Sequence, residues 1–141
     1  MQRAYLLIAT AIIEAGTGLL LLVLPSAPIA MLLGIGSAAP ETLLVGRVAG
    51  AALLALGIAC WPAQGDRKGP AQFGLLIGIL IYDVTAAGLL TYAGLALGMT
   101  GIALWPAVAL HTALAVWCAL CLRGAMTAQR AANPSDVDRR T

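Results

Sequence analysis

Four long apolar stretches run through this chain, separated by shorter segments that hold most of the prolines and charges. They cover residues 4–24, 42–61, 73–92 and 102–122. Each is about the 20 residues that an α-helix needs to cross a hydrocarbon core of roughly 30 Å. The stretches are too long for membrane strands, are rich in Ala, Leu and Gly, and lack strict alternation of apolar and polar residues. The pattern predicts an all-α, four-helix transmembrane bundle.

Each apolar stretch carries one ionisable side chain in its interior, namely Glu14, Arg47, Asp83 and His111. An unpaired charge near the bilayer centre opposes insertion by roughly 2.5–3.5 kcal/mol. The helical rise places Glu14, Asp83 and His111 near the midplane, and Arg47 about one turn nearer the outer surface. We therefore expect all four to face inward as one polar cluster. Arg47 can neutralise only one carboxyl, so the other must be protonated or pair with protonated His111.

Other polar side chains are placed to support this cluster. Residues three, four and seven positions apart share a helix face, so Thr10, Glu14 and Thr17 form one polar seam in the first stretch. Tyr82 is a possible extra hydrogen-bond donor beside Asp83, although it projects about 100° away around the helix.

Two glycine pairs have the GxxxG spacing that allows close helix approach in membranes. Gly46 and Gly50 lie beside Arg47, and Gly74 and Gly78 precede Asp83. Both steps are expected to favour tight packing.

The segment after the first stretch is itself apolar. Pro25 and Pro28 end the first helix, and residues 29–35 are too short to span and too apolar for a free loop. We expect a short outer interfacial helix, or a re-entrant turn, between the first two spans.

Composition agrees with a membrane protein, since 61% of the 141 residues are apolar, 10% are charged and the mean hydropathy is +0.95. Four crossings would place seven of the eight Lys and Arg residues on one side. Because basic residues concentrate in cytoplasmic loops, both termini are predicted to be cytoplasmic in a bacterial inner membrane. The seven residues are Arg3, Arg67, Lys68, Arg123, Arg130, Arg139 and Arg140.

The chain divides into a four-span membrane domain, residues 1–124, and a C-terminal tail, residues 125–141. The tail is polar and contains Asn133-Pro134 as a helix breaker. We expect a disordered cytoplasmic tail.

Candidate chemistry other than the polar cluster is sparse. Metal and haem sites need several donors, and His111 is the single histidine, so no metal or cofactor is predicted. Cys118 and Cys121 have CxxC spacing, and Cys118 shares a helix face with His111, but small buried packing residues are the favoured interpretation. No GxSxG, HExxH or phosphate-binding loop is present, so the chain is not predicted to be an enzyme.

Two resemblances follow from particular segments. The run Ala11-Ile12-Ile13-Glu14-Ala15-Gly16-Thr17 resembles the start of small multidrug resistance exporters, whose dimers use a first-helix glutamate to exchange protons for cationic drugs. That resemblance implies a proton-exchange role for Glu14. The four spans, the outer segment and Arg47-Val48-Ala49-Gly50 resemble uncharacterised four-helix bacterial inner-membrane proteins of DoxX-like architecture, which implies no particular substrate.

Three functions are compatible with these features. The first is a small accessory or interaction protein whose polar cluster holds the fold, with a membrane-protein partner or a second copy of the chain and no nucleic acid. The second is a proton-coupled transporter of small or hydrophobic cationic solutes. The third is a redox or quinone-associated membrane subunit.

Overall fold

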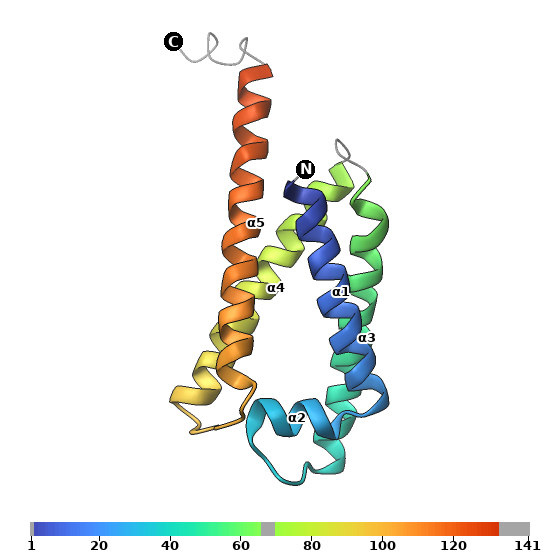
Figure 1. The fold of residues 1–141 in the computed structure, drawn as a ribbon, viewed down its shortest axis with the longest axis vertical. Helices are drawn as coiled ribbons and strands as arrows, with labels where there is room; N and C mark the ends of the chain where they lie inside the picture. Colours follow the sequence, from blue (N-terminus) through green and yellow to red (C-terminus); the bar gives the residue numbers. More distant parts are fainter. Residues whose placement is uncertain (1, 66–69, 133–141) are drawn as a thin grey trace.

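The computed structural model describes residues 2–65 and 70–132, which form five α-helices and no strand (Figure 1). Four of the helices are long and apolar enough to cross a membrane. The all-α, four-helix bundle is therefore confirmed, as is the short helix between the first two spans. The helices are α1 (Gln2–Val23), α2 (Ser26–Leu33), α3 (Pro40–Ala63), α4 (Pro70–Leu95) and α5 (Leu104–Ala132).

The four long helices are arranged as two pairs, with α1 packed along α3 and α4 packed along α5 (Figure 1). Glycines bring the first pair into backbone contact. A Cβ added to Gly18 would lie 2.5 Å from the backbone nitrogen of Leu54, and one added to Gly50 would lie 2.7 Å from the oxygen of Gly18. The α1/α3 pair is therefore a closely packed unit of the kind that small residues allow in membranes.

The second GxxxG pair, Gly74 and Gly78 on α4, does not pack closely against another of the described helices. A Cβ added to Gly74 or Gly78 would meet nothing within 4 Å. This step makes no close helix contact with the described part of the chain, so the expectation of tight packing there was wrong. Spacing alone allows a close approach, but a neighbouring helix must also lie on that face.

Buried apolar side chains gather in the half of the bundle where α1 begins and α5 ends, which we call the terminal half (Figure 1). They come from the first turns of α1 and α4, the last turn of α3 and the middle of α5, so all four spans contribute. This core closes the terminal half. Its buried members are Leu6, Leu7, Ala11, Cys60, Leu76, Ile79, Leu114, Cys118, Cys121 and Leu122.

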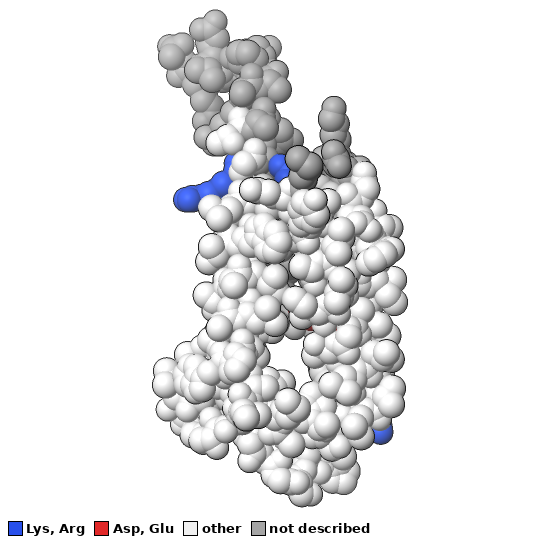
Figure 2. Space-filling view, viewed as in Figure 1, with Lys and Arg blue, Asp and Glu red and all other residues white. Residues whose placement is uncertain are grey.

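The two pairs diverge in the other half of the bundle, which we call the α2 half. Figure 2 shows an opening through the molecule between the α1/α3 pair and the α4/α5 pair, with α2 across its far end and an acidic side chain visible at its upper edge. The bundle is therefore closed in the terminal half and open in the α2 half.

Helix α2 bridges the two pairs at the open end. The side chain of Ile29 packs against Gly46 of α3. A Cβ added to Gly46 would lie 2.8 Å from the Cδ1 atom of Ile29. On the other side, the backbone N–H of Ala103, just before α5, donates to the oxygen of Met31 at 2.9 Å. Gly34 ends α2 with a φ of 72°, a left-handed conformation that favours glycine.

The apolar span within α5 ends at Gly124, and the helix itself continues to Ala132. The first part of the predicted disordered tail is therefore helical. Residues 125–132 are rich in Ala, with Met, Gln and Arg, all strong helix formers, and no Gly or Pro interrupts them. The rest of that tail, 133–141, lies outside the described residues.

Candidate functional site

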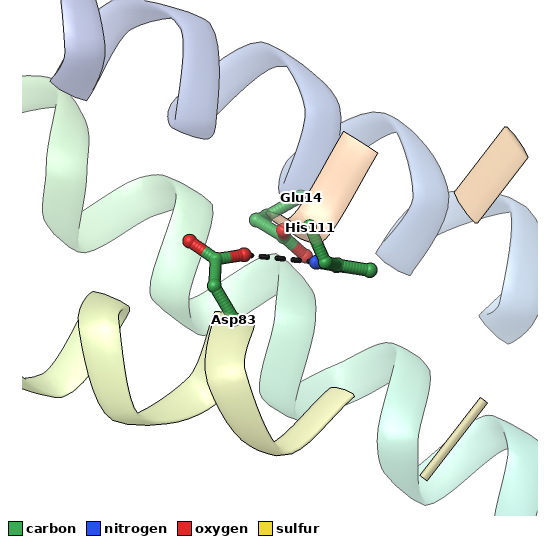
Figure 3. Close-up of side chains that lie close together, drawn as sticks. All are labelled: Glu14, Asp83 and His111. Atoms are coloured by element: carbon green, nitrogen blue, oxygen red, sulfur yellow. Dashed lines mark hydrogen bonds and ion pairs between the residues drawn. The ribbon is translucent and has the colours of Figure 1, made fainter. Parts of the chain in front are cut away.

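Three of the four predicted cluster residues meet in the structure. The Nδ1–H of His111 donates to Asp83 Oδ1 at 2.8 Å. One carboxylate oxygen each from Glu14 and Asp83 and one imidazole nitrogen of His111 all lie within 4.8 Å of one another (Figure 3). Because Glu14 is on α1, Asp83 on α4 and His111 on α5, this cluster joins the two helix pairs.

Helical periodicity explains why these side chains face inward. Glu14 lies on the buried face of α1, one turn after Thr10 and one turn before Gly18, both of which are also buried. On α5, His111 shares its face with the buried residues Leu114 and Ala115. The same faces that pack the core therefore present the polar groups at the boundary between the closed and open halves.

Tyr82 is an additional hydrogen-bond donor to the cluster, a role that its position beside Asp83 made possible. Its hydroxyl donates to Glu14 Oε2 at 3.3 Å, and its ring meets the ring of His111 edge-on, with centroids 5.4 Å apart. Tyr82 and Asp83 are separated by about 100° around α4. One side chain therefore reaches Glu14 on α1, while the other reaches His111 on α5.

Arg47 does not join the cluster, which corrects the prediction that it pairs with one of the two carboxyls. Its side chain is exposed, and its Nε donates to the backbone oxygen of Leu22 at 3.3 Å. The reason is rotational, because Gly46, Gly50 and Gly57 form the face of α3 that is buried, and Arg47 lies about 80° around the helix from it. Arg47 instead satisfies a carbonyl in the last turn of α1, where a cation also interacts favourably with the helix dipole.

The other residues predicted to support the cluster, Thr10, Thr17 and Cys118, differ in burial and position. Thr10 is fully buried beside Glu14, whereas Thr17 is partly exposed. Cys118 lies in the core of the terminal half, and its thiol donates to the oxygen of Leu76 at 3.1 Å. Like Cys60 and Cys121, it is free and buried, so it packs α5 against α4 as the favoured interpretation of the cysteines predicted.

The cluster contains more acid than base. Glu14 and Asp83 are almost fully buried, and in the part of the chain that the structure describes no Lys or Arg pairs with them. Two ionised carboxyls and a protonated His111 would leave one negative charge in excess. Because an uncompensated charge in a low-dielectric interior is strongly unfavourable, the cluster must hold an additional proton or another cation.

Three buried polar atoms in and beside the cluster have no hydrogen-bond partner among the described residues. They are Thr10 Oγ1, Glu14 Oε1 and Asp83 Oδ2. A buried polar atom without a partner is unfavourable by about 1–3 kcal/mol. These atoms therefore offer unused lone pairs at the place where the net charge calls for a cation.

Two carboxylates and one imidazole suit two kinds of chemistry. All three groups exchange protons, and all three are ligands for divalent metal ions. No metal was predicted from the sequence, because the chain has a single histidine. Including the two carboxylates at the depth of His111 would have revealed this donor set.

Comparison of the chain with protein-family models, curated proteins and solved structures gives no match. The resemblance to DoxX-like proteins stays a prediction, and functional inference rests on the geometry of the cluster.

Proposed function

We propose that this protein is a small membrane carrier that exchanges protons for a cationic solute at the Glu14–Asp83–His111 cluster. The observation that carries the proposal is the pair of buried carboxyls that lack a basic partner among the described residues. Ionisable residues inside membrane spans mark ion and proton pathways. Arg47, which would have made the cluster a self-contained structural ion pair, lies elsewhere.

The position of the cluster also supports a carrier. The apolar core seals the terminal half, and the opening lies in the α2 half (Figure 2). His111 keeps 12% of its side-chain surface exposed, so the cluster is not fully enclosed. A site between a closed half and an open half is what alternating access requires.

The two helix pairs provide the moving parts. Backbone contacts at glycines hold α1 against α3, whereas α1 and α3 have few contacts with α4 and α5. We infer that the pairs rock against each other about the cluster, which opens the terminal half and closes the α2 half. Loading with protons or with a solute cation neutralises the cluster and permits this movement.

A second candidate is the accessory or interaction protein predicted from the sequence. It is favoured by the fact that the cluster links helix pairs that otherwise make few contacts. In that role the cluster holds the fold for a membrane-protein partner or a second copy of the chain, with no enzymatic activity.

We further propose a bacterial inner membrane with the terminal half on the cytoplasmic side. Arg3 and Arg123 belong to that end of the bundle, where Figure 2 shows basic side chains gathered. Arg67, Lys68, Arg139 and Arg140 lie outside the described residues, and the side chain of Arg130 is not described.

The carrier is tested in liposomes that contain the purified protein and a trapped pH-sensitive dye. A pH gradient is imposed, and tetraphenylphosphonium, ethidium, Mn²⁺ and Zn²⁺ are added in separate experiments. Solute-dependent dissipation of the gradient that is lost in Glu14→Gln supports the proposal. Glu41→Gln, at an exposed carboxyl in the first turn of α3, is the matched control. No dissipation by any of the four cations would overturn the carrier and leave the accessory role.

A further inference from the structure

We propose that the solute is a divalent transition-metal ion held between Glu14, Asp83 and His111, an inference that rests on the proposed function. Glu14 and Asp83 each supply a carboxylate oxygen, and His111 supplies an imidazole nitrogen. The three side chains come from three helices, so an ion at this position would connect the two helix pairs.

The spacing of the donor atoms fits an ion. Ligands at about 2.1 Å from a metal lie about 3 Å apart when adjacent and about 4.2 Å apart when opposite. The Nδ1 of His111 and Oδ1 of Asp83 are separated by 2.8 Å, and all three donors lie within 4.8 Å of one another. Small side-chain rotations would bring them to bonding distance of one ion.

The unpartnered atoms are an independent indication of a ligand. Glu14 Oε1 and Asp83 Oδ2 are buried and make no hydrogen bond with the described residues. Each is the second oxygen of a proposed ligand, so each carboxylate has capacity for bidentate coordination. Tyr82 donates to the other oxygen of Glu14 at 3.3 Å, which orients that carboxylate as outer-sphere hydrogen bonds do in metal sites.

The donor types select the class of ion. Two carboxylates and one imidazole suit ions of intermediate hardness such as Mn²⁺, Fe²⁺, Co²⁺ and Zn²⁺. Copper(I) prefers thiolate or thioether sulfur, whereas Ca²⁺ and Mg²⁺ prefer oxygen donors. The single histidine of the chain therefore makes the site selective for transition metals over the abundant alkaline-earth ions.

Charge balance also favours a divalent ion. Two ionised carboxylates carry two negative charges, so a cluster that holds one divalent cation has no net charge. Such a cluster avoids an uncompensated charge in the low-dielectric interior.

The test uses purified full-length protein in detergent, with any affinity tag removed so that His111 is the only histidine. Calorimetric titration with Co²⁺ measures the number of ions bound. We expect one ion per chain. Pulsed electron paramagnetic resonance of bound Mn²⁺ should show nitrogen coupling from an imidazole, which in this chain comes from His111 alone.

Substitutions of single residues identify which side chains bind the ion. Glu14→Gln, Asp83→Asn and His111→Gln should each abolish Co²⁺ binding, and Tyr82→Phe should weaken it by about 10- to 100-fold. Glu41→Gln should bind as the unsubstituted protein does. Circular dichroism and gel filtration identify any variant that fails to fold, in which case the number of bound ions and the nitrogen coupling, which need no variant, decide the question.

The outcomes separate the metal site from the carrier. If Co²⁺ and Mn²⁺ do not bind but an organic cation dissipates the pH gradient through Glu14, the metal inference is overturned and the carrier stands. If metal binds with nitrogen coupling but no ion crosses liposomes, the site stands and the carrier falls. Binding without nitrogen coupling, or equal binding of Mg²⁺, also overturns the inference.

Discussion

The Nδ1–H of His111 donates to Asp83 Oδ1 over 2.8 Å, between two helices that pack along each other and at the level where α1 presents Glu14. This contact holds the imidazole beside two carboxyls, where it is the only basic side chain of the cluster among the described residues. Substitutions that remove this hydrogen bond therefore test both the structural and the electrostatic role of the cluster.

The first prediction concerns this pair. His111→Ala leaves the carboxylate of Asp83 buried without its partner, so the free energy of unfolding should fall by about 3–5 kcal/mol. The loss is measured by reversible unfolding in mixed detergent micelles. The neighbouring Thr112→Ala is the control, because Thr112 is exposed and bonds only within α5. In a double-mutant cycle, Asp83→Asn and His111→Ala should be strongly non-additive, and simple additivity would contradict the pair.

A second prediction concerns Arg47. Because its side chain is exposed and contacts only the end of α1, Arg47→Ala should lower the free energy of unfolding by no more than about 1 kcal/mol. Exchange of protons for solute should continue. A loss as large as that of His111→Ala would show that Arg47 neutralises a buried carboxyl, and would restore the cluster of four predicted from the sequence.

The third prediction uses the unequal packing of the glycines. Gly50→Ala places a methyl group 2.7 Å from the oxygen of Gly18, so α1 and α3 must separate and stability should fall by about 1–3 kcal/mol. Gly78→Ala is the matched control. It meets nothing within 4 Å in a helix interior, and should raise stability by up to about 1 kcal/mol. Equal effects of the two substitutions on unfolding would contradict the proposed close α1/α3 unit.

Tyr82 gives a fourth prediction. Tyr82→Phe removes one hydrogen bond to Glu14 and should lower the free energy of unfolding by about 0.5–1.5 kcal/mol. Tyr92→Phe, at an exposed position on the same helix, should have no effect. If both variants unfold alike, the hydroxyl of Tyr82 does not bond Glu14.

The predictions made from the sequence succeeded where length, depth and helical face decide the outcome. Glu14, Asp83 and His111 could be placed together because they lie near the midplane on faces with small or polar neighbours. Arg47 could not, because its direction depends on which face of α3 packs against α1, and that is set by glycine contacts with another helix.

The sequence also did not predict that the four long helices form two pairs, or that an opening lies between these pairs. Every span contributes to the core of the terminal half, so no apolar pattern along the chain marks α1/α3 and α4/α5 as separate units. The choice depends on tertiary contacts, such as those of Ile29 and Met31 on α2, which connect elements far apart in the sequence.

The last prediction tests whether the terminal half opens. Cys60, Cys118 and Cys121 are buried in the core that closes it, and buried thiols are unreactive. In liposomes, N-ethylmaleimide should therefore label them much more slowly than a cysteine introduced at the exposed position Glu41. If the helix pairs rock as proposed, addition of a transported cation exposes the core and should accelerate labelling of the native thiols. Mass spectrometry of the peptides identifies the labelled residue. Labelling that stays slow during measured exchange would show that the terminal half remains closed, and that solute and protons cross without the proposed rocking of the two pairs.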